Sequence, residues 1–174
     1  MDEPERKLVR EAQAGSREAL GALYDAYWPD AHRAAYLIVH DSAAAEDIAQ
    51  DAFLAALDAL DRFDRRRPFG PWLHRIVVNR AIDWSRREAL RRGADRTAEE
   101  LAAPAPAEQV GDEVMAALAQ LPAEQRAVVV LRYLLDYTPG EVARMLEVPR
   151  GTVNSRLRRA LDRLGDLLGA EVVG

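Results

Sequence analysis

The chain has 174 residues, of which 49% are apolar, and a formal net charge of −5. This length suits one or two small domains, and the apolar share excludes a largely disordered chain. The absence of cysteine excludes disulfides, thiolate metal sites and cysteine nucleophiles. No apolar run reaches the ~18–20 residues of a membrane span, and the acidic start lacks the features of a signal peptide. We therefore expect a cytoplasmic protein without membrane insertion.

Charge is distributed unevenly along the chain. Residues 1–61 carry five basic and thirteen acidic side chains, whereas residues 62–96 carry eleven basic and four acidic ones. One basic segment therefore lies between acidic ones. The negative net charge argues against a protein that holds DNA unaided through bulk electrostatics.

The apolar periodicity predicts helices throughout, and no segment shows the alternation of a strand. Ser16 is expected to cap a first helix, which Pro29 interrupts and residues 31–39 continue. A long helix is predicted over residues 43–60. The side opposite its apolar face carries Asp47, Gln50, Asp51, Leu54, Asp58 and Asp61. Such a face is most often only solvated, but an exposed Leu54 within it would suit an interface with a basic partner.

The connector over residues 62–71 combines four arginines with Phe63, Phe69, two prolines and a glycine. Two interpretations stay open here. Basic residues interleaved with aromatic ones can follow a phosphate backbone and stack on an unpaired base. Alternatively, the segment is a basic loop held in place by core phenylalanines.

A further helix is predicted over residues 72–92, with a polar face that forms a second candidate nucleic-acid surface. This face carries Arg75, Asn79, Asp83 and Arg86. Residues 93–111 are rich in alanine, proline and glutamate and are predicted to be a flexible linker. The fold expected is thus all-α, with small helical domains at residues 1–92 and 112–174. The three histidines lack metal-ligand spacing, so no metal or cofactor is expected.

The C-terminal domain contains a helix-turn-helix signature. Thr138 and Glu141 form a capping box with Pro139 in the first turn, and the turn itself falls at residues 147–149. In the following helix, Arg150, Asn154 and Arg158 recur at four-residue steps opposite an apolar stripe, and Ser155, Arg156 and Arg159 flank them. These side chains suit a helix that lies in the major groove.

Three motifs in this order resemble an extracytoplasmic-function (ECF) sigma factor with regions 2 and 4 only. AEDIAQDAFLAAL at residues 45–57 resembles the helix that binds core polymerase, and PWLHRIVVNRAIDWSRR at residues 71–87 resembles the −10 promoter-reading helix. Residues 121–164 resemble region 4. Together these motifs cover most of the chain on both sides of the predicted linker.

The resemblance implies a role for each surface in a factor that directs promoter-specific initiation and performs no bond chemistry. The residues implied to bind core RNA polymerase are Asp47, Gln50, Asp51 and Leu54. Those implied to bind the −10 element are Asp64, Arg65, Arg66, Arg67, Phe69, Arg75, Asn79 and Arg80. Those implied to bind the −35 element are Arg150, Thr152, Asn154, Ser155, Arg156, Arg158 and Arg159. An anti-sigma factor is the further partner implied, and no small-molecule substrate is expected.

The sequence departs from the family pattern at the −35 helix. Asn154 stands where a lysine or arginine is usual and could pair with adenine instead of guanine. Glu147 replaces the usual turn glycine, and Pro139 and Gly140 replace the common Ser-Tyr. These changes leave the −35 preference open.

Two other interpretations are compatible with parts of the pattern. An autonomous helix-turn-helix regulator would bind promoter DNA tightly without polymerase, usually at a palindromic site. An enzyme or interaction module could use paired carboxylates such as Asp47 and Asp51 to bind a metal ion. However, no histidine, nucleophile or glycine-rich phosphate loop accompanies them.

Overall fold

The computed structural model describes residues 3–94 and 111–171, and all regular structure within these ranges is helical. The prediction of an all-α fold is confirmed. Residues 95–110, which make up most of the predicted linker, lie outside the described residues. Across the described part of the chain, no helix combines the length and apolarity that crossing a membrane would need.

The N-terminal half consists of four α-helices and one 3-10 turn. These are α1 (Glu3–Gln13), α2 (Arg17–Val39), α3 (Ser42–Ala59), the turn η1 (Leu60–Arg62) and α4 (Phe69–Ala94). Helices α2, α3 and α4 pack against one another. Small residues such as Ala34, Ala49 and Ala52 are fully buried between them, which allows the three backbones to approach closely.

Two features of this half differ from the sequence-based expectation. Helix α1 was not predicted, but it packs on α2 and buries Val9 and Ala12. The predicted interruption at Pro29 is wrong, because α2 continues through it to Val39. Proline removes one hydrogen bond to the carbonyl of Asp25, but both residues are exposed, so water can reach that carbonyl. Buried residues on both sides of Pro29 hold the helix on its neighbours.

The C-terminal half consists of α5 (Asp112–Ala119), α6 (Ala123–Val129), the π-helical segment η2 (Val130–Leu134), α7 (Pro139–Leu146) and α8 (Arg150–Glu171). The capping box is present as predicted, since Glu141 accepts from the Thr138 backbone and Thr138 accepts from the Glu141 backbone. The turn is also where it was predicted, with Glu147 in the left-handed conformation at a φ of 55°. Helices α7 and α8 therefore form a helix-turn-helix.

The segment after α6 does not continue as a regular α-helix. The backbone N–H of Leu135 instead donates to the carbonyl of Val130 at 3.2 Å, a π-type bond. The N–H of Tyr137 donates to the carbonyl of Leu131 at 3.0 Å. This widened turn redirects the chain and places Tyr137 at the contact between the two halves.

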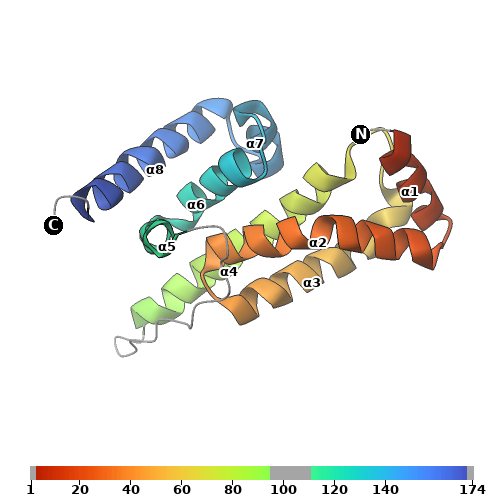
Figure 1. The fold of residues 1–174 in the computed structure, drawn as a ribbon, viewed down its shortest axis with the longest axis horizontal. Coiled ribbons are helices and arrows are strands. Elements are labelled where there is room, and N and C mark those ends of the chain that lie inside the picture. The colour runs from red at the N-terminus through yellow and green to blue at the C-terminus, as the bar shows by residue number, and fades with distance from the viewer. Residues whose placement is uncertain (1–2, 95–110, 172–174) are drawn as a thin grey trace.

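The two halves lie against each other (Figure 1), with α6 and α7 beside α4 and with α6 and η2 beside α2. Helix α8 lies on the outer side of the C-terminal half, away from α4. The polar face of α4 is turned toward the C-terminal half, since Arg75 and Arg86 pair with Glu147 and Glu124. Of the two candidate DNA surfaces, the one on α4 therefore lies at the contact between the halves, and the one on α8 lies on the outer side.

Candidate nucleic-acid and protein interfaces

The acidic face of α3 is fully exposed and surrounds one apolar side chain. Asp41 caps the helix by accepting from the backbone N–H of Ala44 at 2.8 Å. Asp47, Gln50 and Asp51 are exposed, and Leu54 among them is 60% exposed. Leu57 is also partly exposed, next to this face. An exposed leucine ringed by carboxylates suits a docking surface for a basic protein partner.

The acidic face meets the basic face of α4 at one point. Arg80 lies 3.8 Å from the carboxylate of Asp51, and both side chains are exposed. An exposed ion pair of this kind contributes at most about 1 kcal/mol, so either residue can exchange it for an external partner.

The loop between η1 and α4 presents three exposed arginines in a row, Arg65, Arg66 and Arg67. Asp64 shapes this loop, because its carboxylate accepts from the backbone N–H of Arg66 at 3.0 Å and its carbonyl accepts from the N–H of Arg67 at 2.9 Å. The position of the arginines is thus set by a local turn around Asp64.

Phe63 and Phe69 belong to the core, so their rings hold the basic loop in place and are not free to stack on an unpaired base. Phe69 is only 1% exposed and begins α4, three residues earlier than predicted. Its ring packs against Tyr27 at 5.2 Å, and its backbone N–H donates to Glu5 at 3.1 Å. The expectation that Phe69 contacts a base is therefore wrong for this arrangement. The loop is a basic segment held by buried phenylalanines.

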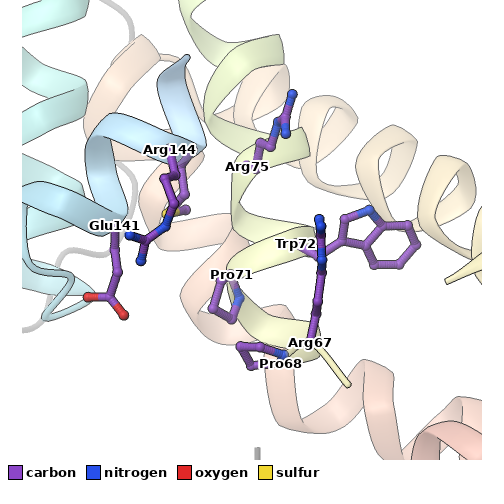
Figure 2. Close-up of a pocket in the computed structure, with 8 residues that line it drawn as sticks. Arg67, Pro68, Pro71, Trp72, Arg75, Glu141 and Arg144 are labelled. Atoms are coloured by element: carbon purple, nitrogen blue, oxygen red, sulfur yellow. The ribbon is translucent and has the colours of Figure 1, made fainter. Parts of the chain in front are cut away.

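A pocket of about 410 Å³ lies between this loop and α7. Its lining residues are Arg67, Pro68, Pro71, Trp72, Arg75, Glu141, Arg144 and Met145. Figure 2 shows that Arg75 and Arg144 come from helices on opposite sides, while the Trp72 indole points away from α7. Trp72 stacks on Phe63 with ring centroids 4.5 Å apart and stays half-buried. Sequence reasoning missed this aromatic ring beside the basic loop, although its place next to Pro71 was a usable signal.

The polar face of α4 is engaged by the C-terminal half. Arg75 donates to Glu147 at 2.5 Å. Arg86 donates to Glu124 at 2.7 Å through one guanidinium nitrogen and at 2.8 Å through Nε. Asn79 lies between these two arginines on the helix and lines a pocket of about 340 Å³ shared with Glu147 and Arg156.

A hydrogen bond between a histidine and a tyrosine also joins the halves. His74 Nδ1 and the Tyr137 hydroxyl are 2.7 Å apart. Burial lowers the pKa of His74 to about 4, against the opposing effect of Asp30, and burial raises the pKa of Tyr137. His74 is therefore a neutral core residue at physiological pH. In residues 3–94 and 111–171, no group of three or more His, Asp or Glu is arranged to hold a metal ion.

Helix α8 presents its predicted reading face to solvent. Arg150, Asn154 and Arg158 are exposed along it, and Arg159 is exposed beside them. Thr152 and Ser155 are half-buried, and the Ser155 hydroxyl donates to the Thr152 carbonyl at 3.0 Å. On the apolar stripe opposite this face, Val153, Leu157 and Ala160 are buried, whereas Leu161 is 44% exposed.

Comparison with known proteins decides the family. The sigma-70 region 2 family matches residues 23–91, and the sigma-70 region 4 family matches residues 111–164. The chain is 40% identical over 172 residues to the ECF RNA polymerase sigma factor SigM of Mycobacterium tuberculosis, covering 94% of this chain and 84% of the relative. The chain belongs to the ECF sigma factors. It is also 27% identical to SigW of Bacillus subtilis, over 91% of this chain and 94% of that one.

Solved structures give the same result for this sigma factor. The structure of CnrH in complex with the cytosolic domain of CnrY matches with a TM-score of 0.72 and 31% identity, covering 95% of this chain and 97% of that one. The RpoE structure from Bartonella quintana in complex with the anti-sigma factor NepR matches with a TM-score of 0.73. At 24% identity over 86% of this chain and 96% of that one, it supports the fold alone.

The family assignment favours sigma-factor function over an autonomous helix-turn-helix regulator. It also places the chain among transcription initiation factors. What sequence reasoning missed in this sigma factor is the contact between Glu124, Glu147 and the arginines of α4. The acidic residues were visible in the sequence, but nothing local indicated which arginines they would meet.

Proposed function

We propose that this sigma factor binds core RNA polymerase through the acidic face of α3. The observation that carries the proposal is the 60% exposure of Leu54 among Asp47, Gln50 and Asp51. Apolar side chains inside a charged rim are the usual arrangement of a specific protein interface. The acidic rim fits a basic partner surface and would guide the encounter.

The −10 element would be bound by the loop and by α4. Asp64 holds the loop in shape while Arg65, Arg66 and Arg67 contact phosphates or an unpaired base. Arg75, Asn79 and Arg80 extend this surface along the helix. Flipping a base costs a few kcal/mol of stacking energy, which a pocket formed in advance must offset.

The −35 element would be bound by α8 as a recognition helix. Asn154 and Arg158 are placed to contact base edges, with Ser155 and Arg159 beside them. Arg150 and Thr152 in the first turn, together with Arg156, would contact phosphates, which position the helix without reading sequence.

An anti-sigma factor is the further partner that we propose. The CnrH relative was solved with the cytosolic domain of CnrY, and the likeness extends over 95% of this chain. Because polymerase, promoter and such a regulator would all act inside the cell, we place the protein in the cytoplasm.

Run-off transcription with purified core polymerase on a promoter library tests the proposal. We expect initiation at particular sites with the unmodified chain, strong loss with Asp51→Arg, and no loss with Glu18→Arg. Glu18 is an exposed acidic residue on α2, outside the proposed interface, so it controls for the change in net charge. Specific binding to DNA without any initiation would instead support the autonomous regulator.

A further inference from the structure

Two ion pairs close the C-terminal half over the basic face of α4. Arg75 pairs with Glu147 at 2.5 Å, and Arg86 pairs with Glu124 at 2.7 Å. We propose that Glu124 and Glu147 form an electrostatic latch that holds the free protein closed and keeps nucleic acid away from α4 until the latch opens. This inference rests on the proposed promoter-binding role of α4.

Glu147 occupies the turn of the helix-turn-helix. Its backbone is left-handed, and its N–H donates to the Ala143 carbonyl as the C-cap of α7. The side chain is thereby directed outward from the turn. There it accepts a hydrogen bond from Arg75, which lies 72 residues earlier in the sequence. A glycine at this turn would satisfy the backbone better, but it would leave Arg75 without this partner.

Glu124 is the second point of the latch. It lies in the first turn of α6 and accepts from two nitrogens of Arg86 on the same oxygen. Burial opposes ionisation of Glu124, but hydrogen bonds from its own backbone and from Arg86 hold its pKa below the usual range. Glu124 is therefore charged at neutral pH.

The latch covers Arg75 and Asn79 of α4 and leaves the exposed face of α8 open. Asn79 lies between the paired arginines and lines the pocket shared with Glu147 and Arg156. A guanidinium held by a carboxylate cannot give the same N–H groups to a phosphate. In the closed arrangement Arg150, Asn154 and Arg158 remain exposed. The −35 surface is therefore free, whereas the −10 surface is free only at its loop and at Arg80.

The latch is suited to opening. Arg75 and Glu147 are both substantially exposed, and exposed pairs are weak and screened by salt. The His74–Tyr137 hydrogen bond and the apolar contacts of α6 with α2 add attraction that salt does not remove. The ion pairs thus supply the salt-sensitive part of the contact, while the uncharged contacts align the two halves.

Energy transfer between two dyes tests the closed state in the full-length chain. The chain has no cysteine, so Ala43→Cys on α3 and Arg163→Cys on α8 supply two exposed labelling positions. We expect transfer to fall as salt rises from about 50 mM to about 500 mM, and to fall at low salt in the Glu124→Gln/Glu147→Gln variant. The matched control Glu113→Gln/Asp162→Asn removes two exposed charges outside the latch and should keep the transfer high.

The charge-swapped variant Arg86→Glu/Glu124→Arg distinguishes an effect of the ion pair from an effect of net charge, because the double change leaves the net charge unaltered. Each single change should open the protein, and the double change should restore transfer. At one fixed salt concentration, fluorescence anisotropy with a single-stranded oligonucleotide should show binding at least about 5-fold tighter for Glu124→Gln/Glu147→Gln than for its control.

Transfer that is unchanged by salt and equal in all variants would overturn the latch, whether or not the chain initiates transcription. A latch that opens as described in a chain that yields no initiation with core polymerase would overturn the proposed function instead. The salt series uses only the labelled parent chain, so the latch stays testable even if a substituted variant does not fold.

Discussion

Glu147 combines a local cost with a long-range contact. Its φ of 55° is a conformation in which non-glycine residues are destabilised, and its side chain bonds to Arg75 in the other half. A residue that destabilises its own turn can thus be favoured because its carboxylate forms an ion pair with a distant segment.

The Glu147→Gly variant measures this balance. We expect the free energy of unfolding to rise by about 0.5–1 kcal/mol, because glycine accepts the left-handed turn and the exposed ion pair contributes little. Urea unfolding checks this. The control Glu147→Gln loses the charge but keeps the backbone cost, so it should not gain stability; equal gains in both variants would contradict the backbone explanation.

At the scale of single elements, α3 shows how an exposed face acquires a specific function. Its N-cap is explained by a local hydrogen bond, and its small apolar residues are explained by packing on α2 and α4. Neither accounts for the exposed side chain of Leu54. The exposed leucine is the residue of this helix that folding alone does not account for.

The Leu54→Glu variant tests that conclusion. We expect binding to core polymerase in the absence of DNA to weaken at least about 10-fold, because a buried contact of the interface becomes a charge. Leu90→Glu is the matched control, since Leu90 is 75% exposed near the end of α4. Equal losses for both variants, measured by a titration of labelled protein, would exclude a specific role for Leu54.

Helix α8 permits a similar comparison within one element. If Asn154 pairs with adenine, Asn154→Ala should remove the preference at one −35 position, by about 1–3 kcal/mol. Arg150→Ala should weaken binding to all sequences about equally, because a phosphate contact reads no base. Selection of promoters from a randomised library with the variant holoenzymes distinguishes the two, and a uniform loss for Asn154→Ala would contradict base reading.

At the scale of the whole molecule, two histidines make stability depend on pH: His74, which is buried, and His40, which is half-buried. Burial lowers the pKa of His74 to about 4, and burial with the nearby Arg126 lowers that of His40 to about 4. In the unfolded chain both have the ordinary value of about 6.5. Between pH 6.5 and 4 the unfolded state therefore binds more protons than the folded state.

We expect the free energy of unfolding to fall as the pH drops through this window, by up to about 1.4 kcal/mol per pH unit for each histidine. Urea unfolding at a series of pH values measures this slope. His74→Gln should remove the contribution of one proton. A slope unchanged by that substitution would show that His74 does not titrate differently in the two states.

The contact between the two halves also belongs to this scale, and it was beyond sequence reasoning. In the sequence Arg75 looked like a nucleic-acid contact and Glu147 like an unusual turn residue, and nothing local indicated that the two would meet. Phe69 looked equally suited to a base or to a core, and its burial at 1% follows from contacts with Tyr27 and Glu5 on other helices.

The sequence by itself determined most of the helices, the capping box, the turn at Glu147 and the exposed faces of α3 and α8. These follow from side-chain periodicity and from hydrogen bonds within four residues, which the local sequence specifies. Only the tertiary structure decided that α2 continues through Pro29, that Phe69 is buried and that Glu124 and Glu147 meet α4. These outcomes depend on packing between segments that are distant in sequence. The local sequence is compatible with many such contacts, and the burial of apolar surface in the folded protein determines which of them form.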